Sequence, residues 1–259
     1  MKHISSRDNP TFKELKSLVD DVREQRRRGL TMLDGIHLVA AYRDKVGLPA
    51  RLIVSEHGAA QAEIRFLGEA LAGVETLLLK DSLFGALSDL ATPTGVCAII
   101  RIPAAPTNAI RGSCVLLDSL QDPGNVGSIL RTATAAGVGD VFLGPGCAAV
   151  WSPRVLRAAQ GAHFDLHLHE QADLAEVVRS FSGSTIAAVA HGGDSLFKQD
   201  LSGNLAWLFG SEGGGVSPSL ESAANKRVGI PMAQGSESLN VGAAAAICLF
   251  EEVRQKLKL

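Results

Sequence analysis

From residue 114 to the C-terminus, short apolar runs alternate with helix-like segments, and this alternation leaves few architectures open. The apolar runs are almost continuous, as in CVLLDSL and LAWLFGSE, which is typical of strands that are buried on both faces. The segments between such runs, for example NVGSILRTATAAG, have the apolar spacing of helices. We therefore expect an α/β domain with a mostly parallel sheet covered by helices. Ligands of such sheets bind beyond the carboxyl ends of the strands, so a site is expected in the loops there.

The first hundred residues also alternate helix and strand patterns, and they predict a second α/β domain. Helices are expected at about 11–28, 61–72 and 82–90, and strands at RLIVSE, TLLLK and GVCAIIRI. The segment PAAPTNAIRGS interrupts this pattern with prolines, an asparagine and a glycine, which indicates a linker. We predict an N-terminal domain at residues 1–103, a linker at 104–112 and a C-terminal domain at 113–259.

Composition limits the classes of function. A chain of 259 residues, 46% of them apolar, can bury the cores of two ordinary domains. Its net charge of −2 means that any contact with nucleic acid depends on a local basic face. No apolar run reaches about 18 residues, and the N-terminus lacks the layout of a signal peptide, so we expect a cytoplasmic protein without a membrane span. Four cysteines without a C-x-x-C pair are interpreted as reduced core thiols.

Three strand ends share an unusual composition of glycine, proline and polar residues followed by a helix. They lie at residues 117–133, 208–220 and 230–240. In the first, Asn125 is expected to cap the helix. Arg131 lies about 120° further around that helix and could flank the same pocket rim. The alternatives are capping alone for Asn125 and a surface ion pair for Arg131.

The second and third loops add further polar groups. Gly213, Gly214 and Gly215 follow Glu212, and glycine lets a ligand approach the main chain closely. A tight turn that binds nothing is the alternative. In the third loop, Gly235 is expected to allow the turn, and the polar residues precede an alanine-rich helix. These polar residues are Ser236, Glu237, Ser238 and Asn240.

The sequence lacks the motifs of two common kinds of site, the dinucleotide-binding site and the phosphate loop. No G-x-G-x-x-G follows the first strand, and the chain has no G-x-x-x-x-G-K-[ST] phosphate loop. His167 and His169 alternate in an expected strand, and His163 precedes them, without a third ligand at metal-binding spacing. We interpret them as a polar strand face and expect no metal site.

The three loops together resemble the SpoU family, also called the TrmH family, of RNA 2′-O-ribose methyltransferases within the SPOUT superfamily. The resemblance covers roughly residues 115–252, and the N-terminal half is similar, more loosely, to the substrate-binding domain that many members carry. The family motif N-x-G-x-x-x-R is matched by Asn125, Gly127 and Arg131, and the motif G-x-E-G is matched by Gly210, Glu212 and Gly213. The third motif, I-P-M…S-L-N-V, is matched by Ile230, Pro231, Met232, Ser238, Leu239, Asn240 and Val241.

The resemblance implies an S-adenosylmethionine site formed by a deep trefoil knot, and a homodimer whose active site takes parts of both subunits. It implies that Arg131 is either the catalytic base or an anchor for an RNA phosphate, and both roles stay open. Asn125, Glu212, Ser238 and Asn240 are expected to support the same pocket. The cofactor is expected to contact the chain around Leu208, Gly210, Ile230, Met232, Ser238 and Leu239.

RNA contact is expected from the N-terminal domain as well as from Arg131. Arg23, Arg26 and Arg27 share one helical face, although a solvated basic face is the alternative because acids are interleaved with them. The resemblance favours ribosomal RNA as the substrate. A tRNA 2′-O-methyltransferase and an RNA-binding protein of the same fold without turnover remain alternatives. The third alternative is a doubly wound enzyme that acts on a small phosphorylated substrate and uses GSEGGGVS as its phosphate loop.

Overall fold

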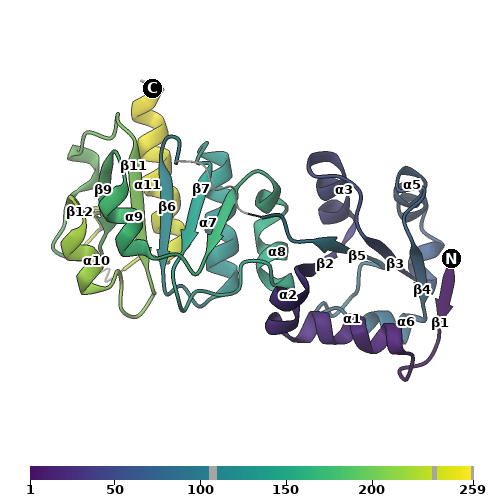
Figure 1. The fold of residues 1–259 in the computed structure, drawn as a ribbon. Helices are drawn as coiled ribbons and strands as arrows, with labels where there is room; N and C mark the ends of the chain where they lie inside the picture. The colour runs from purple at the N-terminus through teal and green to yellow at the C-terminus, as the bar shows by residue number, and fades with distance from the viewer. Residues whose placement is uncertain (105–109, 235–237, 258–259) are drawn as a thin grey trace. The chain divides into compact units, whose positions relative to one another are not determined.

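The computed structural model describes residues 1–104, 110–234 and 238–257, which form two compact units (Figure 1). The first unit contains Met1–Ala104 together with Trp151–Phe164. The second contains Ala105–Val150 and Asp165–Leu259. Each unit is built around its own sheet.

The sheet of the first unit is mixed, with the strand order β1-β4-β3-β5-β2. Strand β5 runs antiparallel to β2 and β3, whereas β4 is parallel to β1 and β3. Strands β1 and β2 are not among the predicted elements. The strands are β1 (Lys2–Ile4), β2 (Leu30–Asp34), β3 (Arg51–Ser55), β4 (Thr76–Leu79) and β5 (Val96–Arg101).

Helices and sheet of the first unit enclose a core to which α1 contributes Phe12, Leu15 and Leu18. The single helix expected at 11–28 is two helices, because Asp21 has extended backbone and its carboxylate accepts a hydrogen bond from Arg23 N, which starts a new helix. Helix α3 lies outside the predicted elements. The helices are α1 (Pro10–Asp20), α2 (Val22–Arg28), α3 (Ile36–Lys45), α4 (Glu56–Ala59), α5 (Ala62–Ala70) and α6 (Asp81–Gly85).

Residues 151–164 pack with the first unit, although they come from the segment that was expected to form the C-terminal domain. They form α8 (Pro153–Ala159) and the 3-10 turn η1 (Ala162–Phe164). Thr31 Oγ1 donates to the Trp151 carbonyl at 2.7 Å, and the rings of Tyr42 and Phe164 meet edge to face at 5.4 Å. Helix α8 therefore packs against β2, an edge strand of the first sheet.

The second unit has a seven-stranded sheet in the order β10-β12-β9-β11-β6-β7-β8. Every strand pair in it is parallel, as the apolar runs predict. The strand before the third polar loop ends at Gly229, so that Ile230 to Met232 belong to the loop. The strands are β6 (Cys114–Asp118), β7 (Asp140–Leu143), β8 (His167–Glu170), β9 (Ser184–Ala188), β10 (Asp194–Ser195), β11 (Leu205–Gly210) and β12 (Lys226–Gly229).

Helices cover both faces of this sheet (Figure 1). On one face, Ala206 and Leu208 pack with α9 and α10. The alternate residue Trp207 points to the opposite face, where α11 packs beside α7. None of the described helices is long and apolar enough to cross a membrane. The helices are α7 (Pro123–Ala135), α9 (Leu174–Ser180), α10 (Pro218–Ala223), α11 (Val241–Lys256) and the 3-10 turn η2 (Leu196–Lys198).

The four cysteines carry free thiols. Cys97, Cys114 and Cys248 are buried, and Cys147 is half-buried. Burial raises the pKa of the Cys114 and Cys248 thiols to about 12, so both stay protonated at neutral pH.

Candidate functional site

Three loops that follow strands of the second unit meet in a small polar cluster, which consists of Asn125, Glu212 and Asn240. The Nδ2 atom of Asn125 donates a hydrogen bond to Glu212 Oε1. The Nδ2 atom of Asn240 donates to Asn125 Oδ1 at 2.9 Å and to Glu212 Oε1 at 3.3 Å. The carboxylate therefore receives two amide donors, and each loop contributes one member of the polar cluster.

Asn125 is available to the polar cluster because another residue caps its helix. Asp122 is the N-cap of α7, and its carboxylate accepts from Asn125 N at 2.7 Å. Pro123 takes the first helical position. The prediction that Asn125 caps the helix is therefore wrong, and its side-chain amide is directed to Glu212 instead.

Asn240 belongs to the polar cluster and also caps α11. Its Oδ1 accepts from Gly242 N at 2.9 Å and from Ala243 N at 3.3 Å. With the oxygen bound to the helix terminus, the amide nitrogen must face Asn125 and Glu212. The positive end of the α11 dipole also lies beside the Glu212 carboxylate, which stabilises the negative charge there.

The glycine-rich loop after β11 folds back on itself. A bridge pairs Ser211 with Gly215, whose N donates to the Ser211 carbonyl at 2.8 Å. A Cβ on Gly210 would lie 1.9 Å from main-chain atoms of Gly215. Gly210 is thus required by contact with its own loop, whereas a Cβ on Gly213 would meet nothing within 4 Å. Pro218 begins helix α10, and Ser217 before it makes no side-chain cap.

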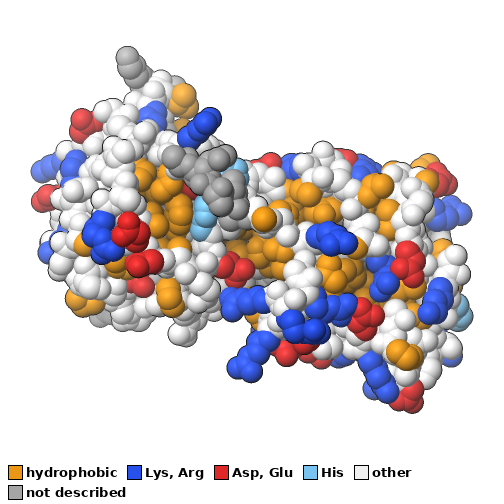
Figure 2. Space-filling view, viewed as in Figure 1, with side chains coloured by type: hydrophobic (Ala, Val, Ile, Leu, Met, Phe, Trp, Pro, Cys, Tyr) orange, Lys and Arg blue, Asp and Glu red, His pale blue; other side chains and the backbone are white. Residues whose placement is uncertain are grey.

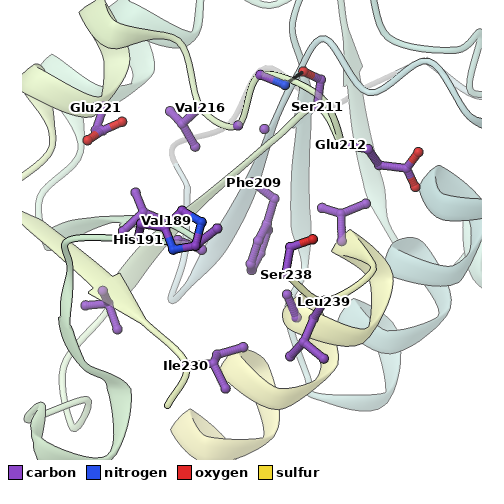
Figure 3. A pocket seen from close by; sticks show the side chains of 18 of the residues that line it. Val189, His191, Phe209, Ser211, Glu212, Val216, Glu221, Ile230, Ser238 and Leu239 are labelled. Atoms are coloured by element: carbon purple, nitrogen blue, oxygen red, sulfur yellow. Dashed lines mark hydrogen bonds between the residues drawn. The ribbon is translucent and has the colours of Figure 1, made fainter. Parts of the chain in front are cut away.

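A cavity of about 480 Å³ adjoins the polar cluster (Figure 3). Among the residues expected to hold a cofactor, it is lined by Gly210, Ile230, Met232, Ser238 and Leu239. Leu208 is instead buried in the core between the sheet and helices α9 and α10. The expected contributions of Gly235, Ser236 and Glu237 lie outside the described residues.

One wall of the cavity was not expected from the sequence. Figure 3 shows Val189 and His191 on one side of the cavity and Glu212 and Ser238 on the other. His191 follows the end of β9 and is itself followed by two glycines. The other three loops of the site have the same glycine-rich and polar composition, so the sequence contained a pattern that could have indicated His191. Glu221 and Arg227 also line the cavity and form an ion pair at 2.5 Å.

Arg131 is exposed on α7 between buried apolar neighbours, among them Ile129, Leu130 and Ala133. Within the described parts of the chain, its guanidinium makes no hydrogen bond or ion pair, so the surface ion pair considered as an alternative is absent there. It also lies outside the polar cluster and outside the described lining of the cavity. Its charge is thus open to an external partner.

The arginines expected to bind RNA lie on α2 of the first unit. Figure 2 shows Lys and Arg side chains gathered over α1 and α2, with acidic side chains between them. Arg23, Arg26 and Arg27 are all exposed. Arg27 donates to both carboxylate oxygens of Glu24, at 2.9 and 2.7 Å. The interleaved acids therefore neutralise part of the basic face.

The two strand histidines converge on a carboxylate from the neighbouring strand. His167 Nδ1 and His169 Nε2 lie 3.2 and 3.1 Å from Asp140 Oδ1, and the His169 ring stacks on Phe142. Sequence spacing does not reveal this carboxylate, because β7 and β8 are paired only in the sheet. Across the described residues, no group of three or more His, Cys, Asp or Glu side chains could hold a metal ion.

Comparison with known proteins matches residues 112–250 to the SpoU rRNA Methylase family. The 23S rRNA (guanosine(2553)-2′-O)-methyltransferase RlmP of Bacillus subtilis is 28% identical over 96% of this chain and 98% of its own. Among solved structures, the SpoU methyltransferase AviRb from Streptomyces viridochromogenes in complex with AdoMet is 25% identical, with a TM-score of 0.87 over 96% of this chain and 98% of its own. An AdoMet-bound rRNA methyltransferase from Sinorhizobium meliloti is 25% identical, with a TM-score of 0.84 over 99% and 98%.

Proposed function

Because the chain belongs to the SpoU rRNA methylase family, we propose that it is an S-adenosylmethionine-dependent methyltransferase that modifies a ribose 2′-hydroxyl in ribosomal RNA. The observation that carries the proposal is the cavity beside Asn125, Glu212 and Asn240 at the carboxyl ends of parallel strands. The names of the similar proteins support both the substrate class and the cofactor. The same proposal divides the chain into an RNA-binding N-terminal domain at 1–103, a linker at 104–112 and a catalytic domain at 113–259.

The cavity suits this cofactor. S-adenosylmethionine carries a flat purine, a ribose and a charged amino acid group, and it supplies a methyl group activated by a sulfonium. Phe209, Ile230 and Leu239 give apolar walls for the purine, and the glycine-rich loop at 210–215 lines another wall. Polar groups are available at Ser238 and Glu212. A volume of about 480 Å³ lies within the usual range for small-molecule sites.

The remaining requirement is to align the ribose hydroxyl, and we assign this role to Arg131. A guanidinium has a pKa above about 12 and is a poor proton acceptor near neutral pH. It binds a phosphate through two parallel hydrogen bonds, which fixes the position of the RNA backbone. Correct alignment can supply a large part of the rate. Asn125, Glu212, Ser238 and Asn240 are proposed to maintain the polar end of the pocket.

The proposed active form is a homodimer in which a second copy covers α7 and α11. The exposed side chains on these helices include Arg131, the small Ala243 and Phe250, whose surface is 48% exposed. An apolar side chain so exposed beside small residues suits a close helix contact. This arrangement would bring Arg131 of one subunit to the cavity of the other. The proposal includes the deep trefoil knot, in which the chain end of the last strand is threaded through a loop.

Asn240→Ala is expected to weaken S-adenosylmethionine binding about tenfold in calorimetric titration, because the polar cluster loses its connecting amide. It should also destabilise the protein by about 1 kcal/mol through loss of the α11 cap. Asn9→Ala is the matched control, since Asn9 caps α1 of the first unit in the same way. It should lower stability similarly without changing affinity. Equal effects of both substitutions on affinity would contradict the site.

Transfer to RNA tests the function itself. Ribosomal RNA treated with the protein and methyl-labelled S-adenosylmethionine should yield labelled, alkali-resistant dinucleotides, because alkaline cleavage needs the free 2′-hydroxyl. Labelled products that are fully cleaved by alkali would place the methyl group on a base and refute ribose methylation. RNA binding without label would favour the RNA-binding alternative without turnover.

Arg23→Ala and Arg26→Ala should each reduce the slope of log binding constant against log salt concentration by about 0.7–0.9, if each side chain contacts one phosphate. Arg27→Ala should have a smaller effect than Arg23→Ala, because Glu24 already binds the Arg27 guanidinium. Arg179→Ala is a control, since Arg179 is similarly exposed and pairs with Glu176 on α9. Filter binding over a salt series measures the slopes. Unchanged slopes for Arg23 and Arg26 would place RNA elsewhere.

A further inference from the structure

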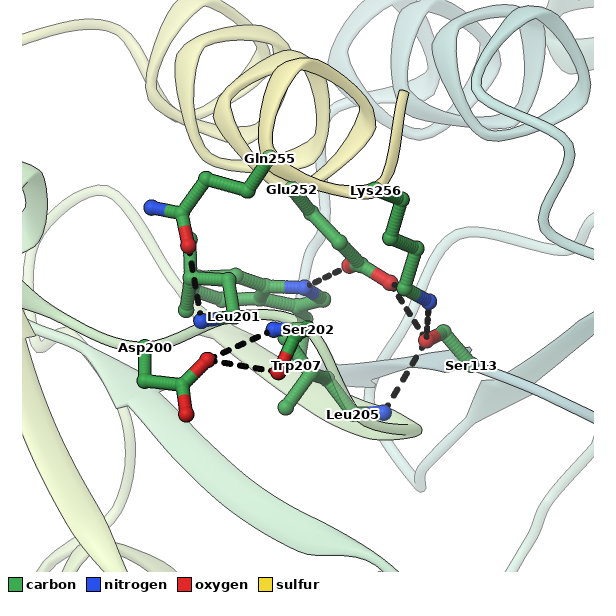
Figure 4. A network of polar contacts seen from close by, with 9 residues as sticks. All are labelled: Ser113, Asp200, Leu201, Ser202, Leu205, Trp207, Glu252, Gln255 and Lys256. Carbon is green, nitrogen blue, oxygen red and sulfur yellow. Dashed lines mark hydrogen bonds and ion pairs between the residues drawn. The ribbon is translucent and has the colours of Figure 1, made fainter. Parts of the chain in front are cut away.

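Helix α11 begins at the polar cluster and ends in a second, buried polar network (Figure 4). Asn240 caps its first turn, and Glu252 lies three turns later, roughly 18 Å along the axis. Glu252 is only 4% exposed. A buried carboxylate is costly unless hydrogen bonds satisfy it, so its partners indicate what it does.

Glu252 is fully engaged by donors from three parts of the second unit. Its Oε2 accepts from Trp207 Nε1 at 2.6 Å, and its Oε1 accepts from Ser113 Oγ and from Lys256 Nζ, the latter at 2.6 Å. Ser113 Oγ in turn accepts from Leu205 N at 2.9 Å. The carboxylate thus joins α11 to the start of β6 and to β11.

The elements joined by Glu252 are those that carry the polar cluster at their other ends. Strand β6 begins after Ser113 and leads into α7 with Asn125. Strand β11 contains Trp207 and leads to Glu212. Helix α11 itself starts at Asn240. One carboxylate therefore contacts the residue before β6, the middle of β11 and the C-terminal part of α11, and these three elements lead to or begin at Asn125, Glu212 and Asn240.

We infer that Glu252 is a positioning residue for the site: it sets the rotation and height of α11 against β6 and β11, and so holds Asn240 against Asn125 and Glu212. This inference rests on the proposed function of the polar cluster. Half of the residues in the N-terminal half of α11 are alanine, and contacts between small apolar side chains have little directional preference. Directional hydrogen bonds from Trp207 and Ser113 select one placement of the helix.

Glu252→Gln tests the inference with little change in volume. A glutamine has one acceptor oxygen, so it cannot accept from Trp207 on one side and from Ser113 and Lys256 on the other. Glu251→Gln is the matched control, because Glu251 is 8% exposed and accepts hydrogen bonds from Arg254 and Gln255, which belong to α11 itself. We expect S-adenosylmethionine affinity to fall about tenfold for Glu252→Gln and by less than about twofold for Glu251→Gln.

The titrations are made well below the thermal midpoint of each variant, with circular dichroism confirming that the protein is folded. Tryptophan fluorescence gives a second readout in a Trp151→Phe background, which leaves Trp207 as the reporter. Trp207 stacks with Phe209, which lines the cavity, so the cofactor should change its emission. That change should be smaller in Glu252→Gln than in Glu251→Gln at saturating cofactor.

A Glu252→Gln protein with a lower midpoint but wild-type affinity and emission change would overturn the inference, because Glu252 would then only stabilise the fold. If Glu252→Gln does not fold, Trp207→Phe removes a single donor and should weaken affinity several-fold in calorimetry. Unchanged affinity in that variant would also overturn the inference. A wild-type protein that binds no cofactor, with or without RNA, would instead refute the proposed function, and the inference would fall with it.

Discussion

Arg131→Ala is expected to reduce methyl transfer about 10²–10³-fold while leaving the Kd for S-adenosylmethionine unchanged. The side chain is exposed and outside the described lining of the cavity, so its removal should cost neither stability nor cofactor binding. What it removes is the contact that orients RNA. Single-turnover transfer to ribosomal RNA and calorimetry with the cofactor measure the two effects separately.

Arg131→Lys distinguishes the ways in which this residue could act. Lysine retains the charge but loses the planar fork that binds a phosphate through two hydrogen bonds. We therefore expect partial activity and a weaker KM for RNA, with transfer still supported at saturating RNA. A lysine variant as inactive as the alanine variant at every RNA concentration would contradict simple phosphate anchoring.

The Arg131→Ala variant also tests the proposed dimer, by complementation with a second variant. If Arg131 acts at the partner's cavity, coexpression of Arg131→Ala and Asn240→Ala subunits creates one intact site in each heterodimer. At cofactor concentrations well below the Kd of the Asn240→Ala site, where that site is about tenfold less occupied than the wild-type site, random pairing would then restore about one quarter of wild-type activity. If each subunit instead forms its site from its own residues alone, the coexpressed variants would give no more activity than the two variants assayed separately. A double variant coexpressed with either single variant provides the inactive baseline.

Gly210→Ala is expected to lower the free energy of unfolding of the second unit by about 3 kcal/mol. The new Cβ would lie 1.9 Å from Gly215 main-chain atoms and 2.1 Å from Val216 N, and backbone cannot move aside as a flexible side chain can. Because Gly215 and Val216 line the cavity, S-adenosylmethionine binding should be lost together with the native loop.

Gly213→Ala is the matched control for stability, since a Cβ there meets nothing within 4 Å. It should leave the free energy of unfolding within about 0.5 kcal/mol of wild type. Urea denaturation followed by Trp207 emission in a Trp151→Phe background reports the second unit, because each unit contains one tryptophan. If the urea midpoint of Gly210→Ala equalled that of Gly213→Ala, the loop would accommodate the new Cβ without loss of stability, and the prediction would be wrong.

Part of this molecule could be predicted from local sequence patterns. Near-continuous apolar runs separated by helical segments predict parallel strands, since each run must be buried on both faces wherever it pairs. Glycine and polar residues after three of these runs indicated the loops of the site. Family motifs then indicated Asn125, Glu212 and Asn240, which the fold brings into mutual contact.

The partners of individual side chains were decided only by the tertiary structure. Asn125 and Asn240 are 115 positions apart, and Ser113 and Glu252 are 139 apart. In the sequence EEVRQK, Glu252 has the pattern of a solvated helix end, and it is buried only because α11 packs on Trp207. Likewise, α8 has a helical pattern that does not reveal which sheet it covers. Periodicity specifies which face of an element is apolar, whereas its partner depends on how distant segments close together.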